Sequence, residues 1–196
     1  ILRQGGLVAI PTETIYGLAG NALKESSVSK IFKAKNRPSF DPLIVHTNSL
    51  HKVESFVRYI PDQAIQLAKQ FWPGPLTLLL QKKSIVPDLV TSGLDSVAVR
   101  IPNHELTLSL LAQLEFPLAA PSANPFGYVS PTTAEHVEAQ LGHTVDYILD
   151  GGACRVGVES TIVSFLEEKP KVLRLGGLAV EQIEEVIGSV RVNKHS

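Results

Sequence analysis

Short apolar runs bounded by proline are the feature that most constrains how this chain can fold. Leu7–Ile10 stops at Pro11, and Leu76–Leu80 begins directly after Pro75. Such continuous apolar stretches are typical of strands covered on both faces. Segments with helical periodicity separate them, at residues 28–35, 50–59, 61–71, 103–114, 132–141 and 180–187. The chain therefore combines buried strands with amphipathic helices that pack against them.

The composition predicts one soluble globular domain. Of the 196 residues, 44% are hydrophobic and 19% are charged, which is enough for a continuous core. We assign residues 1–188 to this domain and residues 189–196 to a tail or the start of a linker. The formal net charge of −1 gives no global attraction for nucleic acid, and no apolar run approaches the length of a membrane span. The single cysteine, Cys154, excludes an internal disulfide and fits a reducing compartment, so we expect a cytoplasmic protein.

One predicted helix, Val28–Lys35, ends in two cations. Its apolar face repeats at i, i+3 and i+4, and Lys35 falls on the next position of that face, where the pattern calls for a hydrophobic residue. Pro38 ends the helix, so Lys35 and Arg37 converge just before a short apolar strand that finishes at His46. A snorkelling lysine and an arginine that offsets the helix dipole are the alternative interpretation.

Donor side chains follow several of the predicted strands. Thr14 lies in the polar segment 11–18, at a strand end of the kind that carries ligand groups in α/β sheets, although a simple turn explains it equally well. In the alternating strand 96–101, Ser96 and Arg100 share one face.

Two further segments present donors in an ordered way. Flanking prolines hold Ser122 and Asn124 in an extended or turn conformation, and residues two apart in an extended segment face the same object. Segments 158–165 and 172–175 predict a hairpin in which Arg174 is the charged inner residue of the second strand.

The motifs that the sequence lacks restrict the chemistry. It contains no GxxxxGK[ST] or GxGxxG, so a P-loop or a Rossmann turn does not hold a nucleotide here. It also contains no HExxH, CxxC or GxSxG, so zinc binding and nucleophilic acyl transfer have little support. The remaining lysine, arginine, serine, threonine and asparagine side chains are donors suited to phosphates and a carboxylate. We interpret them as a phosphate-handling site.

A series of sequence blocks in a fixed order extends over nearly the whole chain: 11–18, 35–38 with 42–46, 72–77, 97–102, 122–124, 130–132, 159–163 and 174–176. In these blocks the chain resembles the YrdC family of threonylcarbamoyl-AMP synthases. The resemblance implies an α+β, α/β-like fold with a twisted mixed sheet, flanking helices and a concave basic cavity. It also implies that L-threonine, bicarbonate and ATP give threonylcarbamoyl-AMP and pyrophosphate, which a separate transferase uses to modify the tRNA adenosine beside the anticodon.

The resemblance also implies roles for individual residues. It places the catalytic cations Lys35 and Arg37 on ATP together with Ser96, Ser122, Asn124, Ser130 and Arg174, and it places L-threonine against Thr14, His46, Arg100 and Ser160. Magnesium is expected to enter with ATP. Glu13 and Glu159 lie in segments where it could be held.

Two alternatives remain open at this point. The first is a double-stranded RNA-binding or nucleotide-binding module with weak RNA affinity, built on the lysines of segments 30–37 and 82–83, although the chain lacks an aromatic platform for bases. The second is a carbamoyl-adenylate-forming domain of the hydrogenase-maturation type, which normally accompanies zinc-finger and acylphosphatase-like segments. Pyrophosphate release with threonine or with carbamoyl phosphate separates these interpretations.

Overall fold

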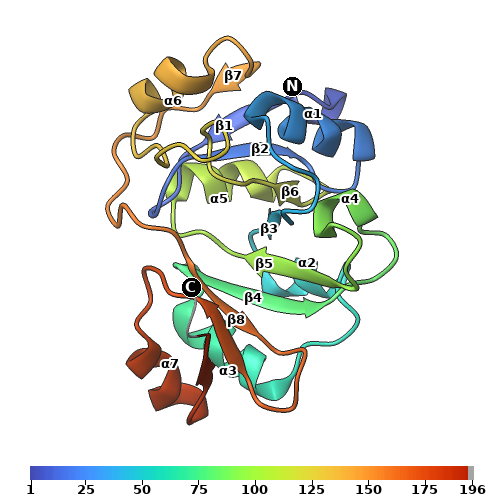
Figure 1. Ribbon diagram of the computed structural model, residues 1–196, viewed down its shortest axis with the longest axis vertical. Coiled ribbons are helices and arrows are strands. Elements are labelled where there is room, and N and C mark those ends of the chain that lie inside the picture. Colours follow the sequence, from blue (N-terminus) through green and yellow to red (C-terminus); the bar gives the residue numbers. More distant parts are fainter. Residues whose placement is uncertain (194–196) are drawn as a thin grey trace.

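The computed structural model describes residues 1–193, which form one mixed sheet with helices on both faces (Figure 1). Its strands lie in the order β10-β9-β8-β4-β5-β3-β6-β2-β1-β7. The strands are β1 Val8–Ile10, β2 Gly17–Asn21, β3 Ile44–His46, β4 Leu76–Gln81, β5 Ser96–Arg100, β6 Leu118–Ala119, β7 Tyr147–Ile148, β8 Thr161–Ser164, β9 Lys171–Arg174 and β10 Arg191–Val192. The helices are the 3-10 turn η1 Leu2–Gln4 and α1 Glu25–Lys35, α2 Leu50–Glu54, α3 Asp62–Phe71, α4 Asp88–Thr91, α5 Glu105–Ala112, α6 Ala134–Leu141 and α7 Val180–Ile187.

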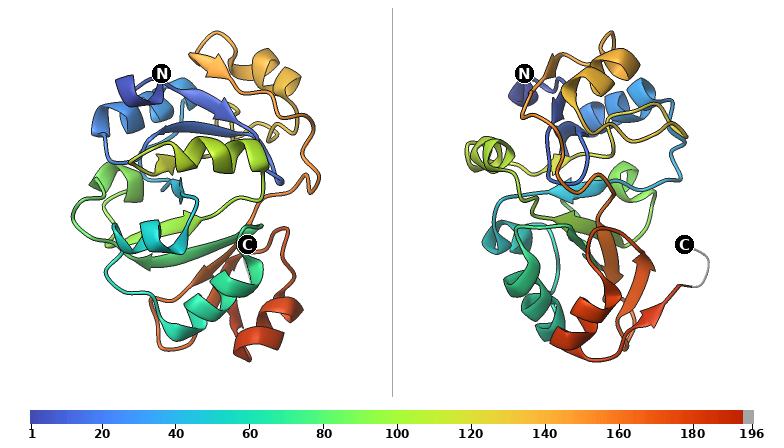
Figure 2. Two further views of the ribbon diagram at one scale, coloured as in Figure 1. Left: turned by 180° about the vertical axis from the view of Figure 1, so that it is seen from behind. Right: turned by 90° about the vertical axis from the view of Figure 1, so that its left-hand side faces the viewer.

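The two faces of the central strands are covered differently. The right-hand view of Figure 2 shows α2, α3 and α5 on one side of the sheet and α1 and α4 on the other. In β5, Val97 and Val99 are fully buried in the main core, whereas Ala98 between them is only half-buried. The same alternation leaves three other side chains half-buried in β3, β4 and β8, namely Ile44, Leu79 and Ile162. One face of the sheet is therefore sealed by the core, and the other stays accessible over β3, β4, β5 and β8.

Most predicted elements are present, with shifted ends. The closing helix α7 has the predicted bounds, while α2 stops at Glu54 instead of continuing to residue 59. The reason is that Val57 bridges to Lys82 and the Arg58 amide donates to the Gln81 carbonyl, so this segment pairs with the end of β4. None of the helices within residues 1–193 has the length and apolar character that a membrane span requires.

Two helices begin later than the sequence predicts. Helix α5 begins at Glu105 with His104 at its N-cap, and the Asn103 amide donates to the Glu13 carboxylate. Helix α6 begins at Ala134 and is capped by Thr133, whose hydroxyl accepts from the His136 amide.

Two strands lie where the sequence did not predict them. Strand β2 begins at Gly17, where a Cβ atom would lie 3.2 Å from the Cβ of Ala120, so close packing explains a glycine in a strand. Strand β10 lies in the predicted tail, because Arg191 and Val192 pair in parallel with β9. The sheet therefore continues past the predicted boundary at residue 188, and residues 194–196 of that tail lie outside the described residues.

Candidate active site

A cavity of about 420 Å³ lies over the accessible sheet face. Its floor includes the half-buried side chains of β3, β4, β5 and β8, and its walls come from the end of α1, the loop after β6 and strand β9. The predicted site residues that line it are Lys35, Arg37, His46, Arg100, Ser122, Asn124, Ser130, Ser160 and Arg174. The fold thus brings together side chains from most of the length of the chain.

Lys35 ends α1 and is almost fully buried, with 1% of its surface exposed. Its ammonium donates to the backbone carbonyls of Ser122 and Asn124 in the loop after β6. Burial, reinforced by the neighbouring charge of Arg37, lowers the pKa of Lys35 to about 7. The helical pattern correctly placed Lys35 on the buried face of α1. Its ammonium contacts carbonyls inside the protein and does not reach out to solvent, which excludes the snorkelling interpretation.

Arg37 and Arg174 are the less deeply buried cations of the cavity. Arg37 pairs with Asp41 at 2.8 Å, donates to the Asp41 and Pro42 carbonyls, and lies 6.0 Å from the centre of the Phe126 ring. Arg174 pairs with the Glu159 carboxylate. Both arginines therefore carry an acidic partner at the cavity wall.

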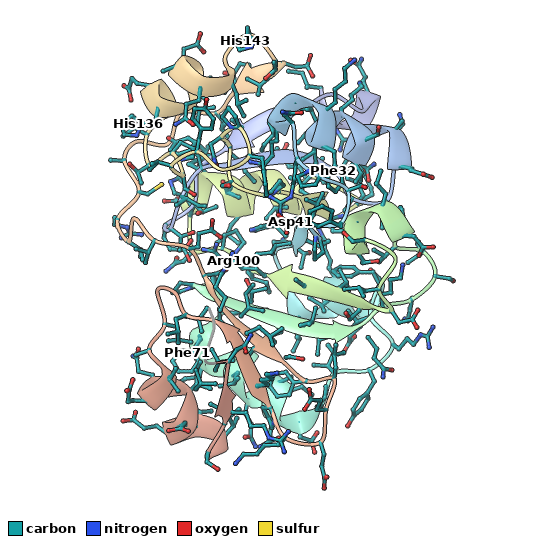
Figure 3. All side chains as sticks on the ribbon, viewed as in Figure 1. Phe32, Asp41, Phe71, Arg100, His136 and His143 are labelled. Atoms are coloured by element: carbon teal, nitrogen blue, oxygen red, sulfur yellow. The ribbon has the colours of Figure 1, made fainter. Side chains whose placement is uncertain are left out.

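Arg100 is buried at the end of β5, with 4% of its surface exposed. Its Nε donates to the Gly74 carbonyl at 3.2 Å, its Nη1 donates to the Thr14 hydroxyl at 2.9 Å, and its Nη2 lies 2.7 Å from Glu13 Oε1. Figure 3 shows Arg100 and Asp41 in the central band of the molecule. Thr14 does not line the cavity but holds the arginine that does.

His46 stands beside Arg100 and is also buried, with 3% exposed. Burial, together with the adjacent arginine, lowers the pKa of His46 to about 3, so the imidazole is neutral at physiological pH. Its Nδ1 lies 3.3 Å from the Ile44 carbonyl. A carbonyl can only accept, so this contact assigns the hydrogen to Nδ1 and leaves Nε2 as an acceptor.

Hydroxyls and an amide complete the lining. The Ser160 hydroxyl lies 2.7 Å from the Thr77 hydroxyl and accepts from Arg174 Nη2 at 3.1 Å. The Asn124 side-chain amide donates to the Pro125 and Tyr128 carbonyls, which fixes the loop at the cavity wall. Its Oδ1 is buried and has no protein partner among residues 1–193.

Ser96 shares a sheet face with Arg100, as the alternation predicts, but it does not line the cavity. Arg100 pairs with Thr77 at one end of β4, whereas Ser96 pairs with Gln81 at the other end. The length of β5 therefore separates Ser96 from the deep end of the cavity, which we define by the lining residues Arg100, His46 and Ser160.

The pairing of carboxylates with the arginines is the part of the site that the sequence analysis did not predict. Asp41 and Glu159 line the cavity as partners of arginines, and Glu13 lies behind Arg100. The cavity is therefore cationic but partly neutralised. Within residues 1–193, no group of three or more His, Cys, Asp or Glu side chains could hold a metal ion.

The accessible face of the mixed sheet gathers buried cations and hydroxyls, which are donors suited to anionic groups. The chain belongs to the Sua5/YciO/YrdC family, described as "Telomere recombination", which matches residues 1–176. It is 52% identical over 192 residues to a threonylcarbamoyl-AMP synthase of Pyrococcus abyssi and 47% identical over 195 residues to that of Bacillus subtilis. These matches cover 98% and 99% of this chain and 56% of each relative, so the chain spans about half the length of the curated relatives it matches.

A solved structure gives the same result for the fold. The crystal structure of P. abyssi Sua5 complexed with L-threonine superimposes with a TM-score of 0.96 at 52% identity, covering 98% of this chain and 56% of that chain. The predicted family and the predicted mixed sheet with flanking helices are therefore confirmed.

Proposed function

We propose that this protein is an L-threonylcarbamoyladenylate synthase. In the proposed reaction the threonine amine and bicarbonate give a carbamate and water. A carbamate oxygen then attacks the α-phosphorus of ATP, and the bond to the bridging oxygen breaks to release pyrophosphate. The products are threonylcarbamoyl-AMP, pyrophosphate and water.

The division of the cavity into two regions is the observation that carries this proposal. The deep end offers a buried guanidinium at Arg100 and a neutral imidazole at His46, which suit the carboxylate and hydroxyl of an amino acid. The other region offers the cations of Lys35, Arg37 and Arg174, which suit a triphosphate. The two curated relatives carry the name of this activity, and the solved relative contains L-threonine.

Fixed charges are the main catalytic resource of such a site. The reaction brings a carbamate, a carboxylate and a triphosphate together, so oriented donors must offset their mutual repulsion. Lys35 suits this role because its ammonium is already held by two carbonyls at the cavity wall. The ammonium group therefore needs little reorganisation to contact a phosphate.

Magnesium enters this proposal as part of the substrate Mg·ATP. Asp41 and Glu159 are the carboxylates that line the cavity, and each is within reach of an arginine that would bind phosphate. Carboxylate oxygens together with phosphates are common magnesium ligands. These two residues therefore suit contact with the ion.

The proposed product implies a partner. A carbamoyl adenylate is an activated acyl donor, so the enzyme acts before a transferase that passes the threonylcarbamoyl group to tRNA adenosine, and both act in the cytoplasm. Direct RNA binding and carbamoyl-adenylate formation have no support from the comparisons, and the assay below tests the second of them.

The test is pyrophosphate release by the purified protein with L-threonine, bicarbonate and Mg·ATP. We expect release that requires all three substrates, and a product with the mass of threonylcarbamoyl-AMP. Lys35→Met, which keeps the apolar stem of the side chain, should lose activity and keep the fold. Release with carbamoyl phosphate in place of threonine and bicarbonate would refute the proposal.

A further inference from the structure

The ion pair between Glu13 and Arg100 is the most deeply buried of the ion pairs in residues 1–193, with 5% and 4% of the two side chains exposed. Glu13 itself does not line the cavity. Its Oε2 accepts the Asn103 amide at 2.9 Å, which fixes the carboxylate behind the guanidinium. The acid is therefore placed to act on the cavity through Arg100 and not through direct contact with a ligand.

The two groups of this pair are in close contact. Glu13 Oε1 and Arg100 Nη2 are 2.7 Å apart, and Glu13 is the strongest ionic influence on Arg100. Glu13, which does not line the cavity, thus neutralises the guanidinium from behind it. Gly74 and Thr14 hold the other two nitrogens.

The charges around the deep end follow from this arrangement. His46 is neutral, and the Thr77 and Ser160 side chains are uncharged hydroxyls. The ionic groups that act on Arg100 are Glu13, which is the strongest, and the more distant pair Arg174 and Glu159. The sum over the deep end is close to zero charge, although Arg100 still offers directed donors.

We propose that Glu13 is a specificity-determining residue that cancels the field of Arg100, so that the deep end accepts a zwitterionic amino acid and excludes phosphate. This inference rests on the proposed function, in which the deep end takes threonine. The cavity must receive two kinds of anion at two cationic regions. A neutralised pair penalises a dianion that arrives without its own cation, which is discrimination by an unfavourable interaction with the wrong ligand. The ammonium group of the amino acid removes that penalty on entry. When the amine later becomes the carbamate, the other cations of the cavity, Lys35, Arg37 and Arg174, offset the new charge.

The test is inhibition by inorganic phosphate at saturating Mg·ATP, which occupies the outer cations. Phosphate should leave the threonine KM of the wild type unchanged. In Glu13→Gln, which keeps the side-chain size and an acceptor for the Asn103 amide, about 10 mM phosphate should compete with threonine and raise its apparent KM about fivefold. Glu13→Asp keeps the charge and should behave like the wild type toward phosphate, whatever its threonine KM.

The matched control is Glu115→Gln, which makes the same change in net charge at a surface pair with Arg3. It should remain indifferent to phosphate. Competition by phosphate in the wild type, or an indifferent Glu13→Gln, overturns the inference. If Glu13→Gln does not fold, Glu13→Ser serves as the uncharged variant, since it is small enough to admit water beside Arg100.

Calorimetric titration with inorganic phosphate tests the same point without turnover. Glu13→Gln should bind one phosphate per chain more than the wild type, and Glu13→Gln/Arg100→Gln should lose that extra phosphate. If Glu13→Gln binds the extra phosphate but the wild type makes no threonylcarbamoyl-AMP, the proposed reaction is refuted and the charge argument is supported. If the wild type makes threonylcarbamoyl-AMP but Glu13→Gln binds no extra phosphate, the charge argument is refuted and the proposed reaction is supported.

Discussion

His46 and Arg100 stand opposite each other in the parallel pairing of β3 and β5, and both side chains are buried at the deep end of the cavity. Burial, together with the guanidinium, keeps the imidazole neutral, and the Ile44 carbonyl selects the tautomer with an acceptor at Nε2. Among the threonine-binding candidates, Thr14 is already engaged by Arg100 and Thr12, so His46 is the better partner for a substrate hydroxyl.

Selection of threonine should therefore depend on His46. A site built to hydrogen-bond a hydroxyl rejects the analogue that lacks it, so 2-aminobutyrate should bind at least ~10-fold more weakly than threonine. In His46→Leu the two ligands should bind alike. Calorimetry with each ligand measures this, and a His46→Leu protein that still prefers threonine would contradict the assignment.

The same histidine predicts a loss of stability in acid. Its pKa is about 3 in the folded protein, below the ordinary value of 6.5, so between these pH values the unfolded chain binds more protons. The free energy of unfolding should fall as the pH decreases from 6.5 towards 3. In His46→Gln this fall should be shallower. Urea titrations at several pH values measure the difference, and parallel curves for the two proteins would exclude the effect.

Lys35 predicts proton uptake when ATP binds. Its pKa of about 7 leaves much of the population uncharged just above neutral pH, and an arriving triphosphate favours the charged form. ATP binding at a pH just above 7 should therefore take up protons, which titration calorimetry detects in buffers of different ionisation enthalpy. Lys35→Arg, which is charged throughout, should bind ATP without this uptake. Equal proton uptake by both proteins would show that a group other than Lys35 takes up the proton.

Substitution of Arg100 should change the KM values of the two substrates to different extents. Arg100→Lys cannot reproduce the planar fork that contacts Gly74 and Thr14 while facing the cavity. The KM for threonine should rise about 10-fold or more, and the KM for ATP should change far less. Initial-rate measurements with each substrate varied decide this. An equal increase in both KM values would remove Arg100 from the amino-acid region.

Much of the fold was predictable because apolar runs report burial directly. The strands containing Leu78 and Val99 and the helix that ends at Lys35 follow from such patterns. Strand β2 was missed because Gly17 and Gly20 suppress the strand signal, and both glycines are explained only by neighbours that are distant in sequence.

The gathering of the candidate residues around one cavity was predictable to a similar extent, and their roles remain predictions. Donor side chains at strand ends are visible in the sequence, and the family resemblance collected them into one site. The pairing of Arg100 with Glu13 was not visible, because it joins segments that only the finished fold brings together. The distance of Ser96 from the deep end likewise depends on the register of β5 against β4.

The pairing of β4 with β8 has a consequence for how the protein is made. Leu76 pairs with Thr161, so a central strand waits for a partner from a distant part of the sequence. Contacts between such distant segments slow folding, since a long loop must close before they form. During synthesis one edge of β4 stays unpaired until β8 has left the ribosome, and an unpaired strand edge is prone to aggregation. The nascent chain is therefore vulnerable from the time β4 emerges until β8 pairs with it.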